Sequence, residues 1–227
     1  MTETAGLSTV HVGIAAPSDM AAIKRFVDTF NEGMLFGRRV PELMRAANAH
    51  RLLVARAASP TGELIGTVVV SDDVVEPTLH TRTTEIGGLL VHPHARGRRV
   101  AGLLTRLALL HDLSASSGAD GAVTYVAHFV LGNDAPREAF RAAGFEPQGI
   151  VEVHPGDVDA DISTLAAPGA HAVRMRSARF DPKHLAAIVD WYRTTLRSGV
   201  YDAGRGRWLN VRFDELSAEI PIDHISV

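Results

Sequence analysis

The stretch that most constrains how this chain can fold is residues 88–110, where a short apolar run, a basic turn and an amphipathic pattern follow one another directly. Apolar residues recur three or four positions apart from Val100 to Leu110, which predicts a helix with one face against a core. We expect this helix to begin near Arg98. A strand, a tight turn and a helix therefore form the predicted centre of the fold.

The turn before this helix concentrates positive charge. Arg96, Arg98 and Arg99 lie within four residues, at a helix end that already carries partial positive charge and unpaired N–H groups. Free amides, the helix dipole and guanidinium groups together favour a multivalent oxyanion such as phosphate. A solvated basic turn is the alternative that three arginines alone leave open.

Strands and helices are predicted on both sides of this centre from hydrophobic periodicity and turn residues. The predicted strands are 10–15, 51–57, 64–71, 83–91, 122–131, a strand that begins at Phe145 and continues over 150–153, and 172–180; the other predicted helices are 20–31 with Ser18 as N-cap, 41–48, 133–143, and one that begins at Asp181-Pro182. Because 83–91 and 122–131 flank one helix, they should pair in parallel, with a ligand crevice beyond their carboxyl ends.

Composition excludes several classes of protein. With 227 residues, 46% of them hydrophobic, the chain can bury a substantial core as one domain with an appendage. A net charge of −3 and a pI of about 6.4 argue against nucleic acid and anionic membranes as partners. The absence of cysteine excludes disulfides and thiolate chemistry. No apolar run approaches membrane-spanning length, and no secretory signal opens the chain, so we expect a soluble cytoplasmic protein.

The basic turn resembles the acyl-CoA binding motif of the GCN5-related N-acetyltransferases, the GNAT superfamily. That motif is Arg or Gln, two residues, Gly, one residue, then Gly or Ala, after a strand that ends in a Val-x-Pro-like turn. In this chain Val91-His92-Pro93 ends the strand, Arg96 fills the first position and Ala101 the last. Arg99 stands where the motif has Gly. Its side chain either reaches outward to the phosphates of coenzyme A or partly obstructs them.

A second segment strengthens the resemblance. Residues 133–145 are similar to the second GNAT signature, Asn-x-x-Ala-x-x-x-Tyr-x-x-x-Gly-Phe, with Asn133, Gly144 and Phe145 in register. Pro136 replaces Ala, and Phe140 replaces Tyr. Both signatures occur in the order of the family, separated by one helix and one strand, which makes coincidence improbable.

The resemblance implies an α/β fold of the α+β type. Its expected features are a mixed, mostly antiparallel central sheet, a parallel pair at the cofactor cleft, and helices on both faces. We expect an acyltransferase domain over residues 8–180, with 181–227 as a helical extension packed on it. Within that extension, residues 199–207 read as a Gly/Arg-rich loop. Homodimers are common in the family, so the resemblance also allows a homodimer.

The resemblance also implies that acetyl-CoA is the co-substrate, with no metal, and that the acceptor is an amine of a small molecule or a peptide. Backbone N–H groups near Leu90 would polarise the thioester carbonyl. The residues assigned in this way to coenzyme A are Leu89, Leu90, Val91, Arg96, Gly97, Arg98, Arg99, Val100, Ala101, Gly102, Asn133 and Phe140. Selectivity for the acceptor is expected in 33–39 and 72–80, with the C-terminal segment as a further candidate that could pack over the substrate mouth, complete a dimer or add to the core.

Removal of the proton from the acceptor ammonium needs a base. Glu85, on the predicted strand, is the first candidate, because family members often use a strand carboxylate there; a rim Glu without catalytic role is the alternative. His128 on the neighbouring strand is a second candidate, although a histidine in an apolar strand is commonly a core residue. Since Phe140 cannot protonate the departing thiolate, water or Tyr125, Tyr192 or Tyr201 would do so.

Two further patterns were weighed. His92 and His94 have the spacing of a metal pair, but no third ligand lies near them in the sequence, which favours an ordinary loop. The arginines of 193–212 are interspersed with acids, as on a solvated face. The sequence thus favours an N-acetyltransferase; a non-catalytic acyl-CoA-binding or regulatory module, suggested by Arg99 and Phe140, is the alternative, and an arginine-rich nucleic-acid binder is a distant third.

Overall fold

The computed structural model describes residues 9–31, 40–72, 75, 82–116, 123–154, 172–204, 207–213, 216 and 220. Its strands are β1 (Thr9–Ile14), β2 (Leu52–Ala57), β3 (Leu64–Asp72), β4 (Arg82–Val91), β5 (Val123–Val130), β6 (Phe145–Val153), β7 (Val173–Phe180), β8 (Val200–Gly204) and β9 (Arg207–Arg212). Its α-helices are α1 (Met20–Phe30), α2 (Val40–Asn48), α3 (Val100–Ser116), α4 (Arg137–Ala142) and α5 (Leu185–Ser198).

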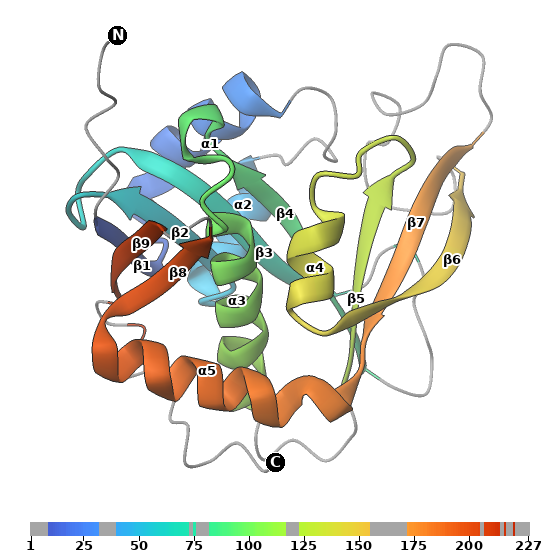
Figure 1. Cartoon of the computed structure of the whole chain (residues 1–227). Coiled ribbons are helices and arrows are strands. Elements are labelled where there is room, and N and C mark those ends of the chain that lie inside the picture. The colour runs from blue at the N-terminus through green and yellow to red at the C-terminus, as the bar shows by residue number, and fades with distance from the viewer. Residues whose placement is uncertain are drawn as a thin grey trace, which may run out of the picture.

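The described strands form one nine-stranded sheet in the order β6-β7-β5-β4-β3-β2-β1-β9-β8 (Figure 1). Two neighbouring pairs, β4–β5 and β1–β9, are parallel, and the other pairs are antiparallel. The predicted α/β fold with a mixed, mostly antiparallel sheet and a parallel pair is therefore confirmed.

Helices cover both faces of the sheet, each over its own core. On one face, α3 packs through Leu103, Leu104 and Leu107 against alternate strand residues such as Val68 and Val70. On the other face, α1 and α2 pack against the residues in between, Val69 among them. Because successive strand side chains point to opposite faces, one run of apolar residues in β3 serves both cores.

The C-terminal half of β4 is free of its parallel partner. The pairing of β4 with β5 ends at Glu85 and Val126. One extra residue of β4 lies opposite β3 near Gly88, which has a φ of 59°, and Thr67 Oγ1 donates a hydrogen bond of 3.2 Å to the Gly88 carbonyl. Glycine suits this bulge because its left-handed backbone is unfavourable for other residues.

Several predicted boundaries shift, each for a local reason. Helix α3 begins at Val100 rather than near Arg98, since Arg99 has a φ of 55° and cannot belong to a right-handed helix. Ser18 is not the N-cap of α1. It lies in a short 3-10 turn, where the Asp19 side chain accepts a hydrogen bond from the Ala16 N–H at 3.0 Å. Helix α4 is shorter than predicted and leaves Asn133 in the turn before it.

The C-terminal segment is not wholly helical, which corrects the expected loop at 199–207. Gly199, with a φ of 63°, ends α5, and the chain returns as the hairpin β8–β9, whose second strand pairs in parallel with β1. Tyr201 and Ala203 of β8, with Leu209 and Val211 of β9, are buried in alternation. This period of two marks strands, and the Gly and Arg residues masked it in the sequence.

Some predictions fall outside the described residues: the loop 33–39, most of the connection 72–80, most of the turn at 116–121 and most of the excursion 154–169. Across the described part of the chain, no helix is both long enough and apolar enough to cross a bilayer.

Candidate active site

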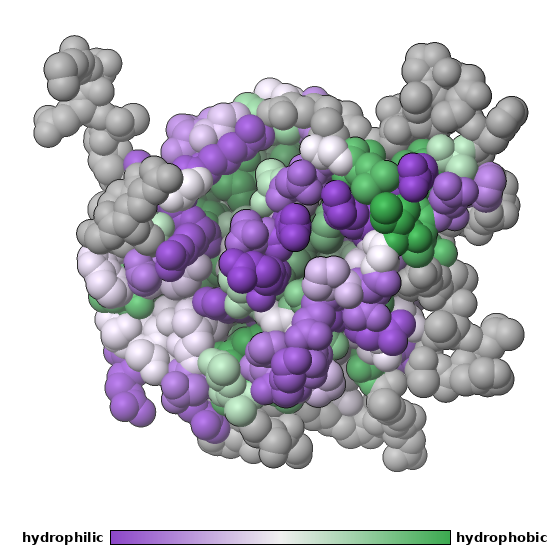
Figure 2. Space-filling view, turned by 45° about the vertical axis from the view of Figure 1, so that its right-hand side comes forward, coloured by the Kyte–Doolittle hydropathy of each residue, from purple (hydrophilic) through white to green (hydrophobic). Residues whose placement is uncertain are grey.

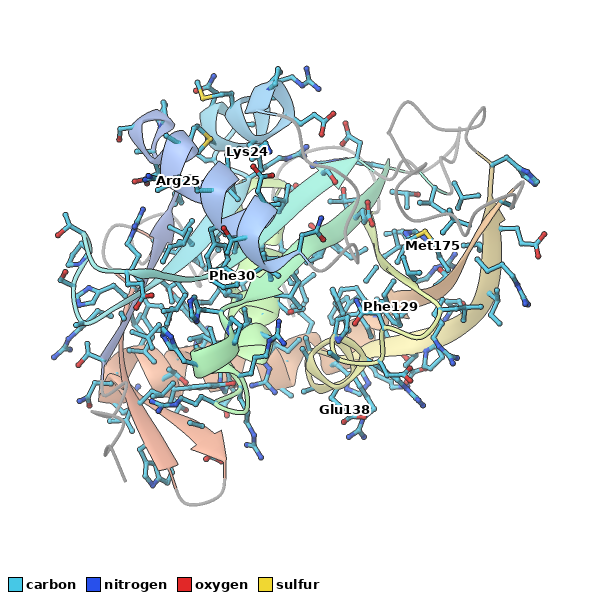
Figure 3. All side chains as sticks on the ribbon, turned by 90° about the horizontal axis from the view of Figure 1, so that it is seen from above. Lys24, Arg25, Phe30, Phe129, Glu138 and Met175 are labelled. Carbon is cyan, nitrogen blue, oxygen red and sulfur yellow. The ribbon has the colours of Figure 1, made fainter. Side chains whose placement is uncertain are left out.

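A cavity of about 990 Å³ lies where the strand β4, the basic turn and α4 meet. Phe30 at the end of α1 and Glu138 of α4 both line it, and Figure 3 shows them on opposite sides of the sheet. The cavity therefore passes from one face of the sheet to the other where β4 and β5 no longer pair. On the face shown in Figure 2, hydrophilic side chains cover much of the surface, some hydrophobic ones lie in the hollows between them, and a hydrophobic patch is exposed at the upper right.

Most residues predicted to hold coenzyme A line this cavity together. They are Leu89, Leu90, Val91, Arg96, Gly97, Arg99, Val100, Ala101, Gly102 and Asn133. Arg98 and Phe140 do not line it. The β4 residues reach the cavity beyond the last rung shared with β5, so no β5 backbone group pairs with them there.

The basic turn presents backbone donors at the start of α3. Gly97 and Arg99 both have left-handed backbones, with φ of 74° and 55°. These two residues turn the chain so that the first residues of α3, Val100 to Gly102, form part of the cavity wall. Because the first N–H groups of a helix lack intrahelical acceptors, this wall suits a phosphate.

The arginines of the turn are not equally available. Arg96 Nε donates a hydrogen bond of 3.3 Å to the Val91 carbonyl, which ties the turn to the end of β4. Arg99 Nη1 lies 3.1 Å from Asp202 Oδ2 of β8, and both side chains are about half exposed. The C-terminal hairpin therefore supplies a carboxylate to the guanidinium that replaces glycine in the signature.

Phe140 serves the core. Its ring stacks on Phe129 at 5.9 Å and meets Phe145 edge-on at 5.2 Å between centroids, and only 3% of the residue is exposed. Aromatic packing of this kind explains an apolar residue where the signature has tyrosine. It leaves no hydroxyl for proton transfer at this position.

The two predicted bases form one buried unit. Glu85 Oε1 lies 3.6 Å from His128 Nδ1, and the side chains are 3% and 0% exposed. On its other side, His128 Nε2 lies 3.4 Å from Ser177 Oγ of β7. Glu85 Oε2 has no hydrogen-bond partner among the described residues. Glu85 sits at the last rung between β4 and β5, where the cavity opens, but neither base lines the cavity wall.

The three tyrosines differ in position. Tyr125 donates a buried hydrogen bond of 2.9 Å to Asp112 Oδ2, and Tyr192 is fully buried. Only Tyr201 lines the cavity, and its hydroxyl donates to the Arg99 carbonyl at 3.0 Å. Tyr201 is thus engaged at the basic turn, away from the end of β4 where a thioester is expected.

In the structure, a third possible metal ligand, Glu63, lies close to His92 and His94. Nε2 atoms of His92 and His94 each lie 3.7 Å from a carboxylate oxygen of Glu63, in the turn between β2 and β3. Burial and, next, the adjacent His94 lower the pKa of His92. Its Nδ1 accepts a hydrogen bond from the His94 N–H at 3.3 Å, which places the ring proton on Nε2. The ligand atoms of Glu63, His92 and His94 lie within 4.8 Å of one another, close enough to hold a metal ion.

The sequence left open whether the C-terminal segment lies over the site, and the structure shows that it forms part of the cavity wall. Trp191 of α5 and Tyr201, Asp202 and Trp208 of the hairpin all line it. Arg106 of α3 lies 4.9 Å from the centroid of the Trp191 ring and donates to the Ala142 carbonyl at 2.7 Å, which joins α3, α4 and α5.

Comparison with protein families matches residues 22–145 of the chain to the acetyltransferase (GNAT) family. The match spans both signatures and the strand and helix between them. Comparison with curated proteins gives no significant match.

Solved structures share the fold at low sequence identity. Arabidopsis thaliana NAA60 in complex with acetyl-CoA superposes with a TM-score of 0.55 at 14% identity, over 76% of this chain and 99% of that one. The NatC complex bound to Gag peptide and CoA gives a TM-score of 0.53 at 14% identity, over 76% and 98%. The Salmonella typhimurium protein yncA with its cofactor acetyl-CoA gives 0.52 at 16% identity, over 77% and 94%.

Proposed function

Because this chain belongs to the acetyltransferase (GNAT) family, we propose that it transfers an acetyl group from acetyl-CoA to a primary amine, by direct attack in a ternary complex. The observation that carries the proposal is the convergence of both family signatures on one cavity. Arg96, Gly97 and residues 99–102 come from the first signature, and Asn133 comes from the second. A module that bound only a phosphate would not need the second signature or the parted strands.

The residues present fit acetyl-CoA. The left-handed backbones at Gly97 and Arg99 and the free amides at the start of α3 suit a diphosphate. The edge of β4 from Leu89 to Val91, which does not pair with β5, offers strand-like hydrogen bonds to an amide-containing arm, except at the Val91 carbonyl, which accepts from Arg96. Acetyl-CoA supplies an acyl group activated as a thioester. Three proteins with a similar fold, NAA60, NatC and yncA, were solved with acetyl-CoA or CoA.

In the proposed reaction the amine nitrogen attacks the thioester carbon, the carbon–sulfur bond breaks, and the electron pair leaves on sulfur. A backbone N–H near Leu90 stabilises the oxyanion. The proton leaves the acceptor nitrogen through water to the Glu85–His128 unit, which lies behind the point where β4 and β5 part. A thiol has a pKa of about 8.5, so the departing sulfur takes its proton from water.

The acceptor is an amine of a small molecule or a peptide. Phe30 and Asn31 line the cavity on its α1 side, opposite α4. The acceptor is expected to approach from this side. The neighbour NatC was solved with a peptide, which motivates a panel that contains both peptides and small amines.

A second candidate is a non-catalytic acyl-CoA-binding module. Two observations favour it: the Arg99 guanidinium is already paired with Asp202, and Phe140 carries no hydroxyl. Release of free thiol from acetyl-CoA over the amine panel separates the two functions. Saturable turnover that is lost in Glu85→Gln supports the enzyme; heat of coenzyme A binding without turnover supports the module. No heat with coenzyme A, together with salt-sensitive nucleic-acid binding, would overturn both.

A further inference from the structure

We propose that Asp202 acts as an internal substitute for a ligand phosphate on Arg99, so that the C-terminal hairpin sets the affinity of the cavity for coenzyme A. The inference rests on the proposed use of acetyl-CoA. It concerns a segment that lies beyond the family match, which ends at residue 145.

The hairpin is joined to the basic turn at two adjacent residues. Tyr201 donates its hydroxyl to the Arg99 carbonyl at 3.0 Å, and Asp202 reaches the Arg99 guanidinium at 3.1 Å. Backbone and side chain of Arg99 are therefore both held by β8. The same carbonyl accepts the Leu103 N–H at 3.1 Å, so the hairpin contacts the first turn of α3 directly.

The contact between the hairpin and Arg99 is held in place because the Tyr201 side chain is buried. It is 5% exposed and meets Trp191 edge-on at 6.1 Å between ring centroids. Burial raises the pKa of the Tyr201 hydroxyl, so it remains a donor at neutral pH. Asp202 follows Tyr201 directly and is consequently held beside Arg99 by a buried neighbour rather than by a mobile surface chain.

Asp202 itself lies in the cavity wall, about half exposed, as Arg99 does. A carboxylate there has two effects on an incoming diphosphate. It occupies a guanidinium that would otherwise form a charge-assisted hydrogen bond, and it repels the negative charge of the ligand. An exposed ion pair is weak enough for a diphosphate to displace.

The hairpin also brings an aromatic side chain to this end of the cavity. Trp208 of β9 is 64% exposed and lines the cavity with Asp202 of β8, across the hairpin pair Asp202–Trp208. Exposed indole at a phosphate-binding turn is suited to contact the nucleotide of coenzyme A. It also provides a signal for binding, since the chain has two tryptophans.

The test compares ligands of different charge by calorimetry at low salt. In Asp202→Asn, coenzyme A is expected to bind about fivefold more tightly than in the parent chain, as loss of a competing exposed pair allows. Pantetheine, which lacks phosphates, is expected to bind both chains equally. At high salt the gain with coenzyme A should shrink, because exposed charges are screened.

A matched control is available at the opposite end of the sheet from β8. Glu152 and Arg174 form an exposed pair of similar geometry, at 3.4 Å, on β6 and β7. Glu152→Gln removes one negative charge without touching the cavity, so coenzyme A affinity should stay at the parent value. A second test uses Trp191→Phe, in which Trp208 is the only tryptophan: coenzyme A should quench its emission, and pantetheine should not.

The outcomes separate this inference from the proposed function. If coenzyme A binds neither chain, the proposed function fails. If it binds the parent chain but Asp202→Asn binds it equally or more weakly, Asp202 instead orients Arg99 or plays no part, and the inference is overturned while acetyl-CoA use stands. The inference would also be overturned if Asp202→Asn raised the affinity for pantetheine as much as the affinity for coenzyme A, because the effect would then not depend on phosphate.

Discussion

His128 Nδ1 lies 3.6 Å from Glu85 Oε1 across the parallel pair β5–β4, and both side chains are closed to solvent. Two residues that the sequence offered as rival bases are thus neighbours in one unit. Each of the two groups is the other's polar neighbour in a buried site, so replacing either one should impair both.

The first prediction concerns this pair. Glu85→Gln is expected to lower kcat about 100-fold or more, since general-base catalysis contributes on that scale, while coenzyme A affinity stays unchanged because the pair does not line the cavity. His128→Gln should give a similar loss, and the double variant should lose little more than either alone. Steady-state kinetics with calorimetry as the folding control measures this. Full turnover in Glu85→Gln would rule the base out.

The second prediction concerns the departure from the signature. Because Arg99 has a φ of 55°, Arg99→Gly should be more stable than Arg99→Ala by about 1 kcal/mol. Arg96 is the control, since its φ of −62° is ordinary; there, Gly should be the less stable of the two. Chemical denaturation of the four variants measures the free energies of unfolding. If the Gly variant were the less stable of the two at position 99 as well as at position 96, the left-handed backbone at Arg99 would be contradicted.

The third prediction concerns the glycine of the second signature. A Cβ at Gly144, where φ is 83°, would lie 2.6 Å from the Cβ of His184 at the start of the C-terminal segment. Gly144→Ala should therefore lower stability by about 2–4 kcal/mol, from overpacking and backbone strain together. Gly149 has a φ of 136° with nothing within 4 Å, so Gly149→Ala isolates the strain and should cost about 1 kcal/mol. Equal losses would show that the close approach to His184 is absent.

The fourth prediction concerns pH. Burial raises the pKa of all three tyrosines, that of Tyr192 to about 12, and for Tyr125 the neighbouring Asp112 adds to the rise. Each folded pKa lies above the unfolded value of about 10, so the associated stability is complete below pH 10 and is lost as pH rises above it.

Absorbance at 295 nm measures the same groups directly. The folded chain should show clearly less tyrosinate at pH 10 than the chain in urea, which should be about half ionised. A folded chain that is as much ionised at pH 10 as the chain in urea would mean that the tyrosines are not buried. Tyr125→Phe should leave the remaining titration unchanged in shape.

Parts of the fold that depend on near neighbours in the chain were predictable. The helix face from Val100 to Leu110 and the hairpin of β2 and β3 follow from periodicity and turn residues. The shift of the α3 start was not, because it depends on the backbone of Arg99, and the position occupied by glycine in the signature was the only hint. The C-terminal hairpin was missed since Gly and Arg interrupt its alternation.

The sequence by itself determined which chemistry is present: two signatures, a basic turn and an unpaired helix start, all encoded within short segments. Only the tertiary structure decided how those groups are used. It joined Glu85 to His128 through strand register, moved Phe140 into the core, and brought Asp202 to Arg99 from 103 residues away. The physical reason is that such contacts depend on the free energy of packing distant segments together, which local pattern does not carry.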